Sequence, residues 1–69
     1  MSTKFVLYRR TSPRGKGVSY IIKSLIQYGE ILNRASERGE VYEREVLAES
    51  TDLALLYQMR DLAEGEEAR

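Results

Sequence analysis

The sequence predicts a small α/β fold in which strands and helices alternate in the order β-α-β-α. Two observations lead to this prediction. An apolar run with high β-propensity opens the chain, and apolar residues at three-four spacing follow it; a similar strand-like and helix-like pair completes the chain. Because a strand, a helix and a returning strand form a right-handed crossover, the two strands should make a short parallel sheet. So small a sheet leaves an open edge, and we expect dimerisation or a helix to complete or cover it.

The first strand is predicted over residues 4–11. Phe5 to Tyr8 form a run of apolar residues that favour strands, and Pro13 and Gly15 then end it. Because apolar residues occupy consecutive positions, both faces of this strand should be buried.

The first helix is predicted from Val18, with Ser19 as its N-cap, to Gly39, a residue suited to the left-handed position that ends many helices. Its apolar seam consists of Val18, Ile21, Leu25, Tyr28, Leu32 and Ala35. Further isoleucines widen the seam, so the helix either wraps tightly around a sheet or meets a second subunit. For the second case, the predicted interface residues are Ile22, Ile26 and Tyr28.

Residues 40–49 fit neither strict alternation nor a clean helical stripe. We predict a strand, because Gly39 precedes the segment and its content is β-branched and aromatic. Ser50 or Thr51 should then cap a second helix, with Asp52 in its first turn. The apolar face of that helix is predicted to hold Leu55, Leu56, Met59, Leu62 and Ala63. Residues 1–64 would form one domain, and residues 65–69 a disordered acidic tail.

Composition excludes several kinds of chemistry. The chain has 69 residues and contains neither cysteine nor histidine, so disulfides, thiolate chemistry, the usual zinc sites and imidazole catalysis are not available. A domain of this size buries only roughly 60% of the surface that its unfolded chain exposes. Oligomerisation is the remaining way to stabilise so small a core. No apolar stretch approaches the ~20 residues that cross a bilayer. We therefore expect a cytoplasmic protein with no membrane association, no cofactor and no metal.

Charge is divided unequally along the chain, although the formal net charge is zero. Six of the eleven cationic side chains, and none of the eleven carboxylates, come before Glu30. Four of these six lie within residues 8–17, together with Gly15 and Gly17. Arginine side chains and backbone N–H groups exposed at glycines both suit phosphate oxygens, so this loop has the composition of an anion site.

In a β-α-β unit this loop would lie at the carboxyl edge of the sheet and lead into the N-terminus of the helix, where anions bind readily. The predicted nucleic-acid or phosphate-binding residues are Arg9, Arg10, Ser12, Arg14 and Lys16. The loop matches neither the GxxxxGK[ST] nor the GxGxxG pattern. The alternative is that Ser12-Pro13 starts a turn and the cations form a solvated rim.

The run Tyr8-Arg9-Arg10-Thr11-Ser12 resembles the Y-x-R-x-S motif that opens the catalytic domain of the serine recombinases, the resolvases and invertases. In outline, residues 4–64 resemble the first β-α-β-α segment of that domain. The resemblance implies DNA strand cleavage and recombination, with Ser12 as the catalytic nucleophile and Arg10 as its arginine partner.

The chain also departs from the family pattern. Pro13-Arg14-Gly15-Lys16 follows Ser12 where the family usually has a threonine and a glutamine, and Lys23 stands near the place of a further glutamine. The arginine-rich segment that completes the family's active site would follow the second helix. The resemblance therefore implies a reduced domain, which we expect not to cut and rejoin DNA by itself.

Two classes of function remain open. The first is a small nucleic-acid-associated protein that holds the phosphate backbone with its basic loop and binds in a strongly salt-dependent way. The second is a small regulatory or inhibitory protein, of the type found in phages and plasmids, that acts by binding another protein. A homodimer suits both. A binding site for a hard cation among Glu40, Glu43 and Glu45 is a weaker hypothesis than either of these, because exposed glutamates usually form a solvated face.

Overall fold

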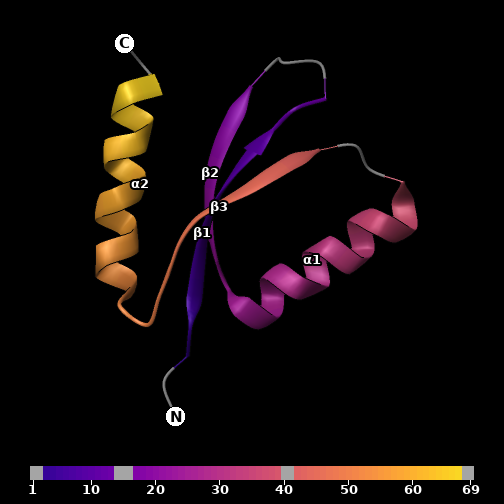
Figure 1. The fold of residues 1–69 in the computed structure, drawn as a ribbon, viewed down its shortest axis with the longest axis horizontal. Helices are drawn as coiled ribbons and strands as arrows, with labels where there is room; N and C mark the ends of the chain where they lie inside the picture. Colours follow the sequence, from indigo (N-terminus) through magenta and orange to yellow (C-terminus); the bar gives the residue numbers. More distant parts are fainter. Residues whose placement is uncertain (1–2, 14–16, 40–41, 68–69) are drawn as a thin grey trace.

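The computed structural model describes residues 3–13, 17–39 and 42–67. Its elements are β1 (Phe5–Thr11), β2 (Val18–Ser24), α1 (Leu25–Arg38), β3 (Glu43–Ser50) and α2 (Leu53–Glu67). The strands form one sheet in the order β2-β1-β3, and both outer strands are antiparallel to β1 (Figure 1). The mixed α/β class is confirmed, whereas the predicted parallel sheet is wrong.

A β-hairpin joins β1 to β2. The Ser12 N–H donates a hydrogen bond of 3.0 Å to the Gly17 carbonyl oxygen, and beyond this bond Thr11 lies opposite Val18. The prediction of a helix from Val18 is therefore wrong. Residues 18–24 carry three β-branched side chains, and pairing with the buried central strand outweighs their helical spacing.

α1 begins directly where β2 ends. The Ser24 hydroxyl accepts a hydrogen bond of 3.2 Å from the Gln27 N–H, and the Gln27 side chain accepts one of 3.3 Å from the Ser24 N–H. These two bonds form a capping box, so Ser24 caps the helix in place of the predicted Ser19. At the other end Gly39 has φ 67° and ψ 28°, which confirms the predicted left-handed helix end.

β3 confirms the strand predicted over residues 40–49, of which residues 40 and 41 lie outside the described ranges. The register shifts at Leu47, which forms a bulge between the pairs Tyr8–Val46 and Leu7–Ala48. Since β2 and β3 are both antiparallel to β1, they run in the same direction. α1 thus connects two like-directed strands, but the hairpin places β1 between them and prevents the predicted parallel pair.

α2 confirms the second helix. The Asp52 carboxylate accepts a hydrogen bond of 3.2 Å from the Leu55 N–H, so Asp52 acts as the N-cap in place of the predicted Ser50 or Thr51. The helix continues beyond Gly65, where the sequence predicts the disordered tail to begin. In the ranges that the structure describes, no helix is long and apolar enough to cross a membrane.

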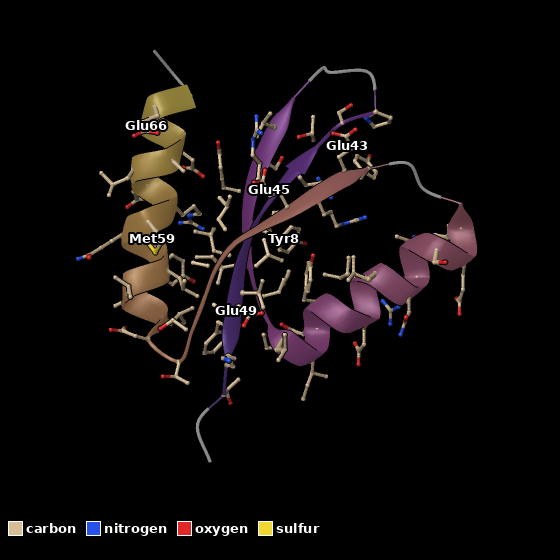
Figure 2. The ribbon with its side chains drawn as sticks, in the orientation of Figure 1. Tyr8, Glu43, Glu45, Glu49, Met59 and Glu66 are labelled. Carbon is tan, nitrogen blue, oxygen red and sulfur yellow. The ribbon has the colours of Figure 1, made fainter. Side chains whose placement is uncertain are left out.

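The sheet lies between the two helices, with α1 over one face and α2 over the other (Figure 1). Val6, Leu7 and Tyr8 of β1 are at most 1% exposed, which confirms the predicted burial of both faces of this strand. Tyr8 lies near the centre of the molecule (Figure 2), and α2 contributes the fully buried Leu56. The Cα positions span 35 × 33 × 10 Å, so the core is thin.

Candidate anion-binding cleft

A cleft of about 290 Å³ between α1 and the sheet gathers much of the positive charge of the molecule. We call it the cationic cleft. Its charged lining residues are Arg10, Lys23, Arg34, Arg38 and Arg44. The other lining residues are Tyr8, Ile21, Ile31 and Ala35. The described part of the lining therefore contains five cations and no carboxylate.

Strand pairing sets two of these cations side by side. Arg10 of β1 lies directly opposite Arg44 of β3. Like charges at directly opposite positions repel and destabilise a sheet. Tyr42 offsets part of this repulsion, because its ring lies 4.8 Å from the Arg10 guanidinium carbon and 5.7 Å from that of Arg44. A bound anion would offset more of it.

Helix periodicity supplies two more cations. Arg34 and Arg38 lie one turn apart on the flank of α1 that also carries Ile31, and all three line the cleft. Arg38 is in the last turn of α1, where the negative end of the helix favours a cation. Ala35 is 6% exposed at the centre of this surface, and its small side chain allows α1 to approach the sheet.

Tyr8 forms part of the apolar wall of the cleft. Its ring lies 4.7 Å from that of Tyr28 in α1, with the two planes tilted by 48°. Burial raises the pKa of the Tyr8 hydroxyl above its ordinary value of 10.0. The nearby positive charges of Arg44 and Arg10 act in the opposite direction, as does a hydrogen bond with Arg44. Tyr8 is therefore a neutral hydroxyl among cations at neutral pH.

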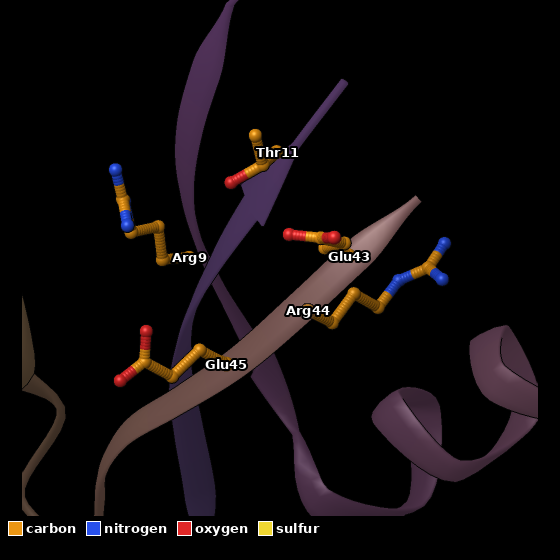
Figure 3. A pocket seen from close by; sticks show the side chains of 5 residues that line it. All are labelled: Arg9, Thr11, Glu43, Arg44 and Glu45. Carbon is orange, nitrogen blue, oxygen red and sulfur yellow. The ribbon is translucent and has the colours of Figure 1, made fainter. Parts of the chain in front are cut away.

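The opposite face of the sheet has a second hollow, of about 370 Å³, whose charges largely compensate each other. In Figure 3 Arg9, Glu43 and Glu45 lie along one side of β1 and β3, while Arg44 points away toward α1. Arg9 lies directly opposite Glu45 in the sheet. Because side chains alternate across β3, its arginine joins the cationic cleft and its glutamates at positions 43 and 45 face the other way.

Of the predicted phosphate-binding residues that the structure describes, Arg10 alone lies in the cationic cleft, and the sheet separates it from Arg9. Ser12 follows β1 and closes the hairpin through its backbone. Arg14 and Lys16 lie outside the described residues.

The predicted support of the loop by a helix N-terminus is wrong. Arg9 and Arg10 belong to β1, and Ser12 and Gly17 are joined by a backbone hydrogen bond at the hairpin end of the sheet. α1 begins at the opposite end, where the Leu25 N–H donates a hydrogen bond of 2.9 Å to the Lys4 carbonyl oxygen. The last turn of α1, not its first, borders the cationic cleft. Side chains alone therefore provide the positive potential there.

The three residues predicted for a subunit interface have different environments. Ile26 is 77% exposed on α1, Ile22 is half-buried in β2, and Tyr28 packs against Tyr8 within the chain. Their place in an interface stays a prediction.

Sequence reasoning missed Lys23, Arg34, Arg38 and Arg44 as site residues. One signal was present, because Arg34 and Arg38 are four residues apart and must share a helix flank. Nothing in the sequence shows that Arg44 pairs with Arg10, since that neighbour relation arises from the sheet.

The described residues contain no group of three or more carboxylates that could hold a metal ion. No family model, curated protein or solved structure matches the chain.

Proposed function

We propose that this protein binds the phosphate backbone of a nucleic acid through the cationic cleft. The observation that carries the proposal is the convergence of five cations, with no carboxylate among the described lining residues, in one cleft of a chain whose net charge is zero. Attraction of a polyanion by net charge is weak for such a chain. Binding would therefore depend on this local separation of charge.

The residue types suit phosphate. Four of the five cations are arginines, whose planar guanidinium groups donate two parallel hydrogen bonds to a pair of phosphate oxygens. The cross-strand pair Arg10–Arg44 supports the proposal further, because an anion between the two groups would turn a repulsion into a shared contact.

Tyr42 favours a nucleic acid over a free phosphate ion. Tyr42 is 39% exposed, and its ring lies next to Arg10 and Arg44, which line the cleft. A base can stack on such a ring while its phosphate is held by the arginines. Because only an unpaired base can lie flat on a tyrosine, we expect single strands to bind more tightly than duplexes.

Fluorescence anisotropy of labelled single- and double-stranded DNA over a salt series tests the proposal. The test variant is Arg34→Gln/Arg38→Gln, which removes two cations from the cleft. The control variant, Arg9→Gln/Arg60→Gln, removes two cations that do not line the cleft and has the same net charge as the test variant. Thermal unfolding of both variants checks that the fold is retained.

We expect the test variant to lose affinity and to reduce the slope of log K against log salt by about one for each phosphate contact removed. The control variant should keep the slope of the parent protein. Equal losses in the two variants would show that binding is not located in the cleft, and absence of binding at low salt would reject the function.

Catalysis by Ser12, as the recombinase resemblance implies, is a separate hypothesis. The element order differs from the β-α-β-α order of that resemblance, and the cleft gathers Arg10 with other cations without Ser12 among its lining residues. Our proposal is therefore binding without strand cleavage.

A protein partner is the second candidate function. It is favoured by the apolar side chains that remain exposed along one edge of the sheet.

A further inference from the structure

The outer edge of β3 is both open and apolar. In the described sheet β3 pairs with β1 alone. An edge strand presents a row of backbone N–H and C=O groups to any strand that approaches it. Two large apolar side chains at the middle of β3, Val46 and Leu47, are 43% and 39% exposed.

The helices on either side extend this apolar surface. On α1, Gln27, Glu30, Ile31 and Arg34 border Lys23 of β2, so the flank with Leu25 and Leu32 lies on the side of α1 away from the β2 edge. Both leucines are exposed.

α2 has a similar apolar flank. In Figure 2 Met59 lies on the near side of α2, and β3 passes in front of β1 in the same view. Met59 is therefore on the side of α2 that borders the β3 edge. Leu55 and Leu62, four residues before and three after Met59, share its flank and are exposed. We call Leu25, Leu32, Val46, Leu47, Leu55 and Leu62 the β3 face.

The other edge of the sheet differs. Beside β2, the neighbouring flank of α1 presents Gln27, Glu30 and Arg34 around Lys23. On α2 the flank opposite Leu55 carries Tyr57 and Arg60, whose guanidinium lies 4.8 Å from the tyrosine ring. One edge is therefore bordered by polar groups and the other by leucines.

The chain also exposes more surface than the usual scaling with mass gives for a monomer of its size. The chain exposes 5235 Å², whereas a folded monomer of 8.0 kDa exposes about 4,450 Å² by the usual scaling with mass. The excess of about 800 Å² equals what each partner buries in a stable interface of standard size.

We propose that a second copy of this chain covers the β3 face, with the two β3 strands pairing antiparallel into a continuous six-stranded sheet. Neighbouring antiparallel strands of two identical chains are related by a twofold axis perpendicular to the sheet, so each residue pairs with one on the same face.

The bulge and the charges select one register for this pairing. Arg44 and Val46 lie on the α1 side of the sheet, opposite Arg10 and Tyr8. The extra residue at the Leu47 bulge shifts the alternation by one, so that Glu49, opposite Val6, also lies on the α1 side. An axis between Val46 and Leu47 then places Arg44 opposite Glu49 of the second copy, and does so twice by symmetry. The same register brings Val46 against Leu47 at the centre. β3 is thus complementary to itself in both charge and apolar character.

A perpendicular axis also keeps both α1 helices on one side of the enlarged sheet. The two cationic clefts would therefore open on the same side of the dimer. Arg44 would face Glu49 of the second copy at the border of the cleft, and the Glu49 carboxylate also lies 3.6 Å from the Lys4 ammonium of its own chain. The dimer itself does not depend on any ligand of the cleft, so its test is independent of the proposed function.

Sedimentation equilibrium of the full chain over a wide range of concentrations tests the proposal. We expect a species of twice the 8.0 kDa chain mass that dissociates on dilution. Val46→Lys places an unpaired charge at the axis and should raise the dimer Kd by more than about 30-fold, as changes at interface hot spots do. The matched control is Ile26→Lys, which adds the same charge on α1 at a position 77% exposed and away from the β3 face; its Kd should equal that of the parent.

Cross-linking provides a second measurement that does not depend on a destabilising variant. The chain has no cysteine, so Leu47→Cys introduces a single thiol next to the proposed axis, and Ser19→Cys introduces one on β2. Mild oxidation should link the first variant into dimers and leave the second monomeric. A monomer at every concentration, linkage through β2 alone, or a dimer broken by Ile26→Lys and not by Val46→Lys would each overturn the proposal; the last result would support the interface predicted around Ile26.

Discussion

The substitution Leu56→Ala tests whether a single buried leucine attaches α2 to the sheet. Leu56 is fully buried, and among the described residues of α2 it is the only one in the core. Truncating a buried leucine to alanine costs about 2–5 kcal/mol, and less where the site can collapse around the cavity. Because the neighbouring Leu53 and Met59 are only half-buried and the core is thin, we expect about 2–3 kcal/mol. A domain of this length has about 3–10 kcal/mol of stability in all, so the loss should be a large part of it.

Urea unfolding followed by far-ultraviolet circular dichroism measures this loss at one fixed protein concentration, since a dimer would make the midpoint concentration-dependent. The control is Ile26→Ala, which truncates an aliphatic side chain that is 77% exposed on α1 and should change stability by less than about 0.5 kcal/mol. If both variants unfold at the same urea concentration, Leu56 does not hold the layers together and the reasoning fails.

Three further predictions concern single side chains. Burial raises the pKa of Tyr8, so the folded protein retains a proton that the unfolded chain releases, and stability should fall as pH rises above about 10. In urea unfolding at successive pH values, Tyr8→Phe should show a smaller fall, and an identical pH dependence would contradict the assignment. Ser24→Ala should cost about 0.5–2 kcal/mol through the lost capping box, and Ser19→Ala less than about 0.5 kcal/mol; the reverse order would favour a helix that begins at Ser19. Ser12→Ala should bind DNA in the anisotropy assay as the parent does, and a large loss of affinity would move the site to the hairpin.

Dimerisation and nucleic-acid binding can be separated by the variants above. Val46→Lys acts at the β3 edge and leaves the five cations of the cleft in place, whereas Arg34→Gln/Arg38→Gln changes the cleft and leaves the β3 face intact. If the two clefts of a dimer bind one strand together, Val46→Lys should also weaken binding to long DNA while binding to short oligonucleotides stays the same.

Local sequence patterns were sufficient for much of the secondary structure. The run from Phe5 to Tyr8 predicted a strand buried on both faces, and Gly39 predicted the left-handed end of α1, because each depends on properties of adjacent residues. The start of α1 was also readable in principle. Ser24 and Gln27 have the spacing of a capping box, but the three-four spacing that continues back to Val18 concealed it.

Composition, spacing and propensity determined the α/β class of this protein and the burial of β1. They also determined that the chain has two helices and that a single strand separates them. Only the tertiary structure decided that residues 18–24 form a strand, because that depends on pairing with β1 and not on their own spacing. The cationic cleft arises in the same way. Arg10, Lys23, Arg34 and Arg44 come from four different elements, and the charge asymmetry along the chain did not indicate that arginines from both halves would meet on one face of the sheet. Long-range pairing sets which side chains become neighbours, and local sequence carries little information about it.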